Sequence, residues 1–146
     1  MTSFEKPVVI DSSVVLRSVL PVNNSTMATE LLRKWFGEGI AVFVPALWFA
    51  EVTSAVHKLL SWGQISADEA ERILDACLNL PVRVQAEDAR FYRSAFDWAF
   101  RLGQHPVYDA LYLALADRLD AQFYTSDRKL YNRCQEIGAS FASLVE

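Results

Sequence analysis

Short β-branched runs alternate along the chain with longer stretches in which apolar residues recur every three or four positions. The short runs predict buried strands, because β-branched side chains favour a packed, extended backbone. We expect five strands, the last of them a weaker edge strand, at residues 7–11, 40–44, 82–85, 121–125 and 139–144. The longer stretches predict seven helices, at residues 13–20, 26–36, 46–62, 67–80, 87–102, 109–119 and 128–137.

The order of these elements predicts the fold class. Strands that alternate with helices pair in parallel through right-handed crossovers. We therefore expect an α/β fold, with a central parallel sheet of about five strands flanked by helices on both faces in three layers. Glycine and proline punctuate the elements without forming a linker, and no internal repeat is present. Residues 1–146 are accordingly expected to form a single domain.

Composition narrows the function classes. The formal charge of −4 argues against a protein that binds nucleic acid through a broad basic surface, so any contact with RNA has to be local. The longest apolar run, 40–50, is interrupted by Pro45 and closed by Glu51, too short to span a bilayer. Cys77 and Cys134 are far apart in the sequence, which suggests that both are reduced thiols. With no signal-peptide pattern before Val8, we expect a cytoplasmic protein without a membrane contact.

Two acidic residues stand at the ends of predicted strands. Asp11 closes the first strand, and Asp127 lies two residues after the fourth. The carboxyl ends of parallel strands meet at one edge of a sheet, where α/β proteins bind their ligands. Both positions also suit the N-cap of the following helix, where aspartate is favoured. The residues alone leave both interpretations open.

Two further acids lie near the starts of helices. Glu51 interrupts an apolar stretch, where an unpaired carboxylate is costly to bury, and Asp109 opens a very apolar helix. The alternatives are a solvated helix stripe shared with Lys58 for Glu51 and an ordinary helix cap for Asp109. If all four carboxylates converge without Lys or Arg partners, they repel one another strongly. Such a cluster is then expected mainly as a site for hard cations such as Mg²⁺ or Mn²⁺.

Four segments resemble the four motifs of PIN-domain proteins in order and spacing, at residues 8–13, 45–51, 108–114 and 125–130. The resemblance covers essentially the whole chain, whose small size is similar to that of VapC toxins from toxin–antitoxin pairs. It implies an acidic quartet that binds one or two metal ions, formed by Asp11, Glu51, Asp109 and Asp127. It also implies that Ser13 and Thr125 are supporting hydroxyl positions.

The resemblance implies a metal-dependent endoribonuclease, a hydrolase that uses Mg²⁺ or Mn²⁺ to cut RNA phosphodiester bonds and leaves 5′-phosphate and 3′-hydroxyl ends. It further implies a toxin that is restrained by an antitoxin protein, and a homodimer. Helices in the first half of the chain are expected to meet these partners. Their aromatic residues, most of which should be core, are Trp35, Phe36, Trp48, Phe49 and Trp62.

A basic patch follows the last acid. Arg128, Lys129 and Arg133 come directly after Asp127 and are candidates for guiding an RNA backbone towards the metal. An ordinary solvated helix face accounts equally well for three charges at this spacing. Neutralising them is expected to weaken RNA binding more than metal binding.

Three other functions are compatible with parts of the pattern. A housekeeping RNA-processing nuclease would share the fold and site but have no antitoxin. A non-catalytic PIN-fold binding module would keep the fold alone, and the intact quartet argues against it. A phospho-acceptor signalling domain also ends its first strand with Asp, but it fits poorly because Ser12 and Ser13 follow Asp11 in place of a second acid.

Overall fold

The computed structural model describes residues 5–21, 24–103 and 105–146. Within these residues four strands form one sheet in the order β2-β1-β3-β4, and every neighbouring pair is parallel. The strands are β1 (Val8–Ile10), β2 (Val42–Phe43), β3 (Gln122–Thr125) and β4 (Ala142–Leu144). The predicted α/β class with a parallel sheet is confirmed. The expectation of no signal peptide concerns a segment whose residues 1–4 lie outside the described part.

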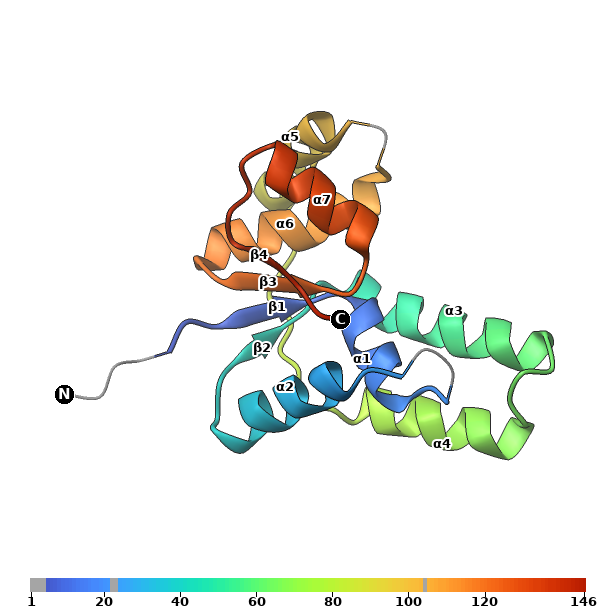
Figure 1. Ribbon diagram of the computed structural model, residues 1–146. Helices are drawn as coiled ribbons and strands as arrows, with labels where there is room; N and C mark the ends of the chain where they lie inside the picture. Colours follow the sequence, from blue (N-terminus) through green and yellow to red (C-terminus); the bar gives the residue numbers. More distant parts are fainter. Residues whose placement is uncertain (1–4, 22–23, 104) are drawn as a thin grey trace.

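Helices cover both faces of this sheet. In Figure 1, α1 to α4 lie on one side of the strands and α5 to α7 on the other. Their bounds are α1 (Ser12–Val19), α2 (Thr26–Gly37), α3 (Leu47–Ser61), α4 (Ala67–Leu78), α5 (Ala89–Leu102), α6 (Val107–Leu119) and α7 (Arg128–Glu136). All seven helices predicted from the sequence are therefore present, with ends that differ by up to two residues. None of the helices in the described residues is long and apolar enough to cross a membrane.

The predicted strand at 82–85 is reduced to a single bridge. Arg83 pairs with Phe43 in parallel, donating its N–H to Val42 and accepting from the N–H of Val44. The side chain of Val84 is exposed, so this segment lacks the two-sided burial that the central strands have. It borders the sheet next to β2 without extending it as a fifth strand.

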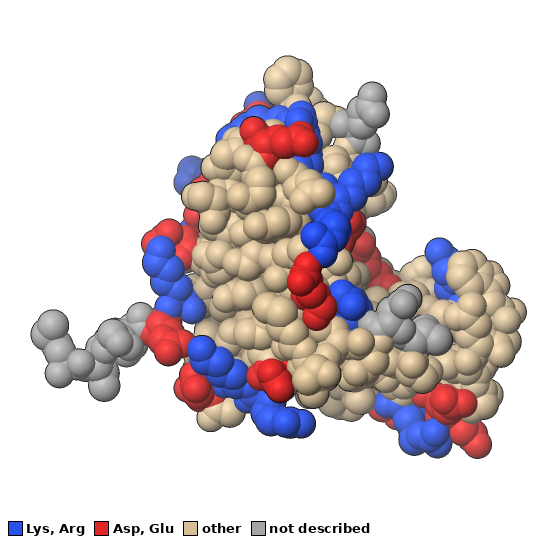
Figure 2. All heavy atoms as spheres, in the orientation of Figure 1, with Lys and Arg blue, Asp and Glu red and all other residues tan. Residues whose placement is uncertain are grey.

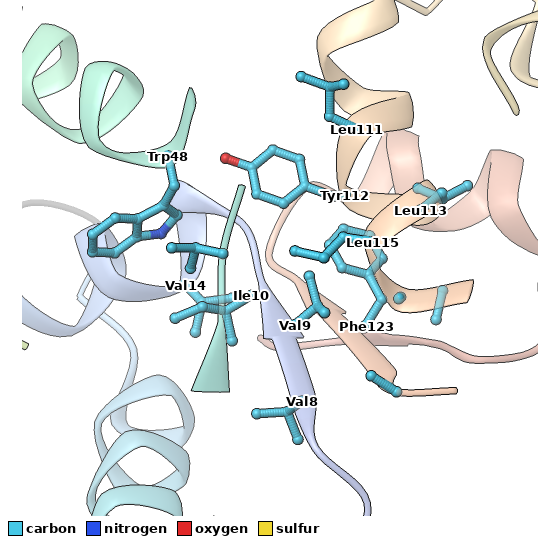
Figure 3. Packing of buried hydrophobic residues seen from close by; sticks show 14 of the residues in the cluster. Val8, Val9, Ile10, Val14, Trp48, Leu111, Tyr112, Leu113, Leu115 and Phe123 are labelled. Atoms are coloured by element: carbon cyan, nitrogen blue, oxygen red, sulfur yellow. The ribbon is translucent and has the colours of Figure 1, made fainter. Parts of the chain in front are cut away.

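The central strands bury side chains on both faces. Figure 3 shows Ile10 of β1 on the side of Trp48, while Val9 points to the opposite side, towards Tyr112 and Phe123. Successive residues of a strand alternate between faces, and here both faces are covered by helices. Because of this burial, β1 is an unbroken apolar run with no polar alternation.

The register of the two central strands brings two acids to one edge. Ile10 is paired with Tyr124, and the N–H of Asp11 donates to the carbonyl oxygen of Tyr124 at 3.3 Å. The chain leaves β1 at Asp11 and leaves β3 just before Asp127, on the same carboxyl-terminal edge. Asp11 and Asp127 each precede a helix at this edge.

Candidate active site

Asp11 is the most buried acid of the site. It is the N-cap of α1, and its Oδ1 accepts from the N–H of Ser13 at 3.0 Å. The Ser13 hydroxyl also donates to Oδ1, and the Thr125 hydroxyl donates to Oδ2. Burial raises the pKa of Asp11 to about 7, against the lowering effect of these two hydroxyls. The N-cap interpretation is thus correct, but it does not account for such deep burial of a carboxylate.

Thr125 and Ser13 join the two strand ends. The N–H of Asp127 donates to Thr125 Oγ1 at 3.0 Å, while that of Ser126 donates to Ser13 Oγ at 2.9 Å. Asp127 is in turn the N-cap of α7 and accepts from the N–H of Leu130 at 3.1 Å. The two predicted supporting hydroxyls therefore contact Asp11 directly and connect it to the loop that carries Asp127.

Glu51 is fixed from across the site. It lies in the second turn of α3, half-buried, and its Oε1 accepts from the hydroxyl of Tyr112 on α6. Burial raises the pKa of Glu51, and so does the nearby charge of Asp109, whereas the Tyr112 hydrogen bond lowers it. The alternative of a stripe shared with Lys58 is correct in part, because Glu51 and Lys58 line the same open cavity, but the Glu51 carboxylate also accepts from a buried tyrosine.

Asp109 lies in the first turn of α6 but does not cap it. The N-cap is Pro106, which has no capping side chain, so the predicted cap role is wrong. The Oδ2 of Asp109 lies 3.4 Å from Nδ1 of His105. Burial raises the pKa of Asp109, and the charge of Asp127 raises it further, whereas His105 lowers it.

The four carboxylates form one electrostatic group. The charges of Glu51 and Asp127 both raise the pKa of Asp11, and Asp109 is coupled in the same way to Glu51 and Asp127. Within the described residues, none of the four forms an ion pair with Lys or Arg. At the carboxyl edge of the sheet the four acids thus act on one another through their charges, with Asp11 buried, Glu51 and Asp109 half-buried and Asp127 exposed.

This donor set has the chemistry that hard divalent cations require, namely carboxylate oxygens. The hydroxyl oxygen of Ser126, beside Asp127, is buried and has no hydrogen-bond partner in the described part of the chain, so it is a further free oxygen at the site. No group of three His, Cys, Asp or Glu side chains there is arranged to hold an ion. The residues fit Mg²⁺ all the same, because this ion is commonly held by one or two carboxylates with waters and substrate phosphates.

The predicted basic patch is largely occupied by internal contacts. Arg128 forms an ion pair with Glu146, and Arg133 donates to the carbonyl oxygens of Leu102 and Arg101 at the end of α5. On the face shown in Figure 2, basic and acidic side chains are interspersed and form no continuous basic band. Among the residues described, the side chain of Lys129 is exposed and forms no ion pair.

A cavity of about 970 Å³ opens beside the acids. Its walls come mainly from α1 and α3, and leucine side chains together with Trp62 make most of its lining apolar. Glu51, Ser13 and Ser126 also line it. An apolar molecule in this cavity would therefore lie beside the carboxylate of Glu51.

Sequence reasoning missed Tyr112 and Ser126. Tyr112 lies three residues after Asp109, so it shares a helix face with an acid, and this spacing was the available signal. Ser126 directly precedes Asp127 at a strand end. The hydrogen bond from Tyr112 to Glu51 joins residues 61 positions apart, and no local pattern reveals it.

Comparison with known proteins gives a family and a set of similar folds. The sequence model of the PIN domain matches residues 8–135. A search of curated proteins finds no significant match.

Several solved structures share the fold at low identity. PAE2754 from Pyrobaculum aerophilum is 20% identical, with a TM-score of 0.67 over 88% of this chain and 79% of that one. VapC20 from Mycobacterium tuberculosis, a toxin that cleaves the sarcin-ricin loop, is 18% identical, with a TM-score of 0.56 over 81% and 86%. VapBC2 from Rickettsia felis, bound to a DNA fragment from its promoter, is 12% identical, with a TM-score of 0.68 over 95% and 98%.

Proposed function

Since the chain belongs to the PIN domain family, we propose that it is a metal-dependent endoribonuclease that hydrolyses RNA phosphodiester bonds and acts as the toxin of a toxin–antitoxin pair. The observation that carries the proposal is the group of four coupled carboxylates, none of them neutralised by a Lys or Arg of the described chain. A buried acid such as Asp11, held beside half-buried acids that repel it, is destabilising unless a cation or a substrate makes use of it.

The residues of the site have distinct tasks in this mechanism. Asp11, Glu51, Asp109 and Asp127 would hold the Mg²⁺ or Mn²⁺ ion. When bound, such an ion polarises a phosphate and lowers the pKa of water. Ser13 and Thr125 fix the orientation of the Asp11 carboxylate by donating to its two oxygens. Tyr112 does the same for Glu51 from the opposite helix. The protein thus supplies placement and negative charge, and no residue of the site is needed as a nucleophile.

The apolar cavity supports the antitoxin part of the proposal. A cognate antitoxin would place an amphipathic segment between α1 and α3, where leucine side chains and Trp62 provide the contact. A basic residue of that segment would meet the carboxylate of Glu51, which lines the cavity. Solved relatives of this fold include the complexes VapBC-1 from Haemophilus influenzae and FitAcB from Neisseria gonorrhoeae.

The nuclease proposal is tested with purified protein and single-stranded or structured RNA. Cleavage should require Mg²⁺ or Mn²⁺, stop with EDTA, and be lost in the Asp11→Asn and Asp109→Asn variants. The matched control is Asp120→Asn, which removes an exposed acid whose backbone is in the left-handed region that Asn also tolerates. Full cleavage by both site variants would reject the mechanism.

Two measurements separate the alternatives. A non-catalytic module with this fold should give no carboxylate-dependent heat in a Mn²⁺ titration, whereas the proposed enzyme should lose that heat in Asp11→Asn. A housekeeping nuclease should cleave RNA but leave host growth unchanged on expression. Growth arrest that depends on Asp11 and is reversed by a co-expressed antitoxin supports the toxin.

A further inference from the structure

The cavity beside the acids follows α3 along its length. Its lining includes Leu47 in the first turn of this helix and Trp62 at the C-cap. At about 1.5 Å per residue, these two positions are roughly 22 Å apart along the helix axis. Glu51 lies on the same wall. The cavity therefore leads away from the carboxylates over a length that takes several nucleotides, which rise roughly 3.4 Å each when stacked.

Two exposed aromatic side chains line this cavity. Tyr108, next to Asp109 on α6, is 57% exposed, and Trp62 is 64% exposed. Neither ring packs against another aromatic ring of the described chain. Exposed aromatic faces along a hollow suit ligands that stack flat on them, and every nucleobase has such a face.

The charges of the cavity favour a polyanion. Apart from Glu51, its charged lining residues are the cations Arg17 and Lys58. The ammonium of Lys58 lies 5.3 Å from the centre of the Trp62 ring. A base stacked on Trp62 would therefore have its phosphate close to a lysine. Aromatic rings combined with cations along a groove are typical of proteins that bind single-stranded nucleic acid.

An unpaired hydroxyl lies beside the acids. Ser126 lines the cavity, and its Oγ is buried without a hydrogen-bond partner in the described part of the chain. Its backbone N–H donates to Ser13 Oγ, which in turn donates to Asp11. A buried hydroxyl without a partner is unfavourable, and a phosphate or ribose oxygen at this position would accept its hydrogen bond.

We propose that this cavity guides single-stranded RNA to the carboxylates, with bases stacked on Trp62 and Tyr108. Lys58 holds a phosphate of this strand, and the Ser126 hydroxyl donates to its backbone beside the acids. The inference rests on the proposed function, which makes RNA the substrate. A strand is preferred over a duplex, because paired and stacked bases offer no free faces. An antitoxin segment in the same cavity would displace the strand, so the two cannot be bound together.

Tryptophan fluorescence of the full chain in EDTA tests the strand path without cleavage. It reports mainly on Trp62, because Trp35, Trp48 and Trp98 are at most 8% exposed. Titration with a short oligoadenylate should quench the fluorescence of wild type, and Trp62→Phe should lose most of this quenching. An oligomer of the same length that lacks bases should quench far less. Absence of quenching in wild type, equal quenching by both oligomers, or undiminished quenching in Trp62→Phe would overturn the proposal.

Fluorescence anisotropy with labelled oligoadenylate, also in EDTA, measures the two stacking contacts. Tyr108→Ala and Trp62→Ala should each raise the dissociation constant by about fivefold or more, the lower end for the loss of one base stack. Tyr108→Phe should keep the affinity, because the ring remains. The matched control is Phe96→Ala, which removes a ring that is 68% exposed on α5 and lies outside the cavity. Unchanged affinity in both cavity variants, or an equal loss in the control, would reject the strand path.

Salt dependence tests the phosphate contact. In Lys58→Gln the slope of log K against log salt should become shallower by about 0.7, the value for one phosphate on a single strand. Lys34→Gln, which removes an exposed lysine of α2 outside the cavity, should leave the slope unchanged. An unchanged slope in Lys58→Gln would overturn this contact.

These binding measurements separate the strand path from the nuclease proposal. If RNA is cut in Mn²⁺ but Tyr108→Ala and Trp62→Ala bind it as wild type does, the strand path is rejected and the nuclease remains. If binding depends on the bases and on both rings but no RNA is cut, the nuclease is rejected and the strand path remains. Circular dichroism and thermal unfolding check that each variant keeps its fold.

Discussion

The burial of Asp11 predicts that the protein becomes less stable as this carboxyl group ionises. The pKa of Asp11 is raised from 3.8 to about 7 in the folded state, so the folded chain binds this proton more tightly than the unfolded chain does. Below the unfolded value the group is protonated in both states and has no effect. As the pH rises towards 7 the unfolded state releases the proton first, and the free energy of unfolding falls.

The size of this effect follows from the difference between the two pKa values. At 1.36 kcal/mol for each pH unit, the ionisation of Asp11 costs the metal-free fold at most about 4 kcal/mol once the pH is above 7. Replacing Asp11 with Asn removes the ionisation but keeps a polar side chain beside Thr125 and Ser13. The variant should therefore gain stability relative to wild type as the pH rises from about 4 to about 8.

Urea unfolding in EDTA, measured for both proteins across that pH range, gives the comparison. At each pH the free energy of unfolding of wild type is subtracted from that of Asp11→Asn, and this difference should rise with pH. Hydrogen bonds lost in Asp11→Asn shift the difference by the same amount at every pH, so they do not change its slope. A difference that stays constant across the range would refute the argument. Adding Mn²⁺ at the upper end of the range should stabilise wild type and leave Asp11→Asn nearly unchanged.

Three further predictions concern the residues around the carboxylates. Tyr112→Phe keeps the ring stacked on Phe123 but removes the donor to Glu51. Because that donor lowers the pKa of Glu51, the acidic limb of the pH–activity profile should move to higher pH, and an unmoved limb would contradict the assignment. Thr125→Val should lower the free energy of unfolding in urea by about 1–3 kcal/mol, since valine cannot donate to Asp11 and leaves that buried carboxyl oxygen without this hydrogen bond. A loss below the error of the measurement would contradict the prediction. Lys129→Ala should weaken RNA binding, most visibly at low salt, without changing the Mn²⁺ affinity measured by calorimetry. If RNA affinity and Mn²⁺ affinity fell equally, Lys129 would belong to the metal site instead.

The positions of the acids on the fold could be predicted from the sequence because they depend on local rules. A β-branched run followed by Asp predicts a strand end and a helix cap, and Asp11 and Asp127 have both. The capping box at the start of α4 follows a local rule too, since Ser66 is followed three residues later by Glu69. These features involve residues a few positions apart, so periodicity and capping preferences suffice to locate them.

Other features depend on contacts between distant segments and could not be predicted. The apolar pattern of α6 shows that Tyr112 is buried, but not that its hydroxyl meets Glu51 on another helix. The same limit applies to the aromatic residues of the first half. Trp35 and Trp48 are core residues, as expected of most of them, whereas Trp62 is exposed beside the cavity. Exposed aromatic residues also occur in the second half, on α5, where Tyr92, Phe96 and Phe100 follow at four-residue intervals.

The hydrogen bond from Thr125 to Asp11 joins residues 114 positions apart, and this separation ties the arrangement of the acids to the pairing of the two central strands. A fragment that contains Asp11 but stops before β3 lacks both the donor that orients the Asp11 carboxylate and Asp127. Local unfolding that separates β3 from β1 removes the same two groups together. The acids should therefore lose their arrangement in the same cooperative step in which the sheet opens.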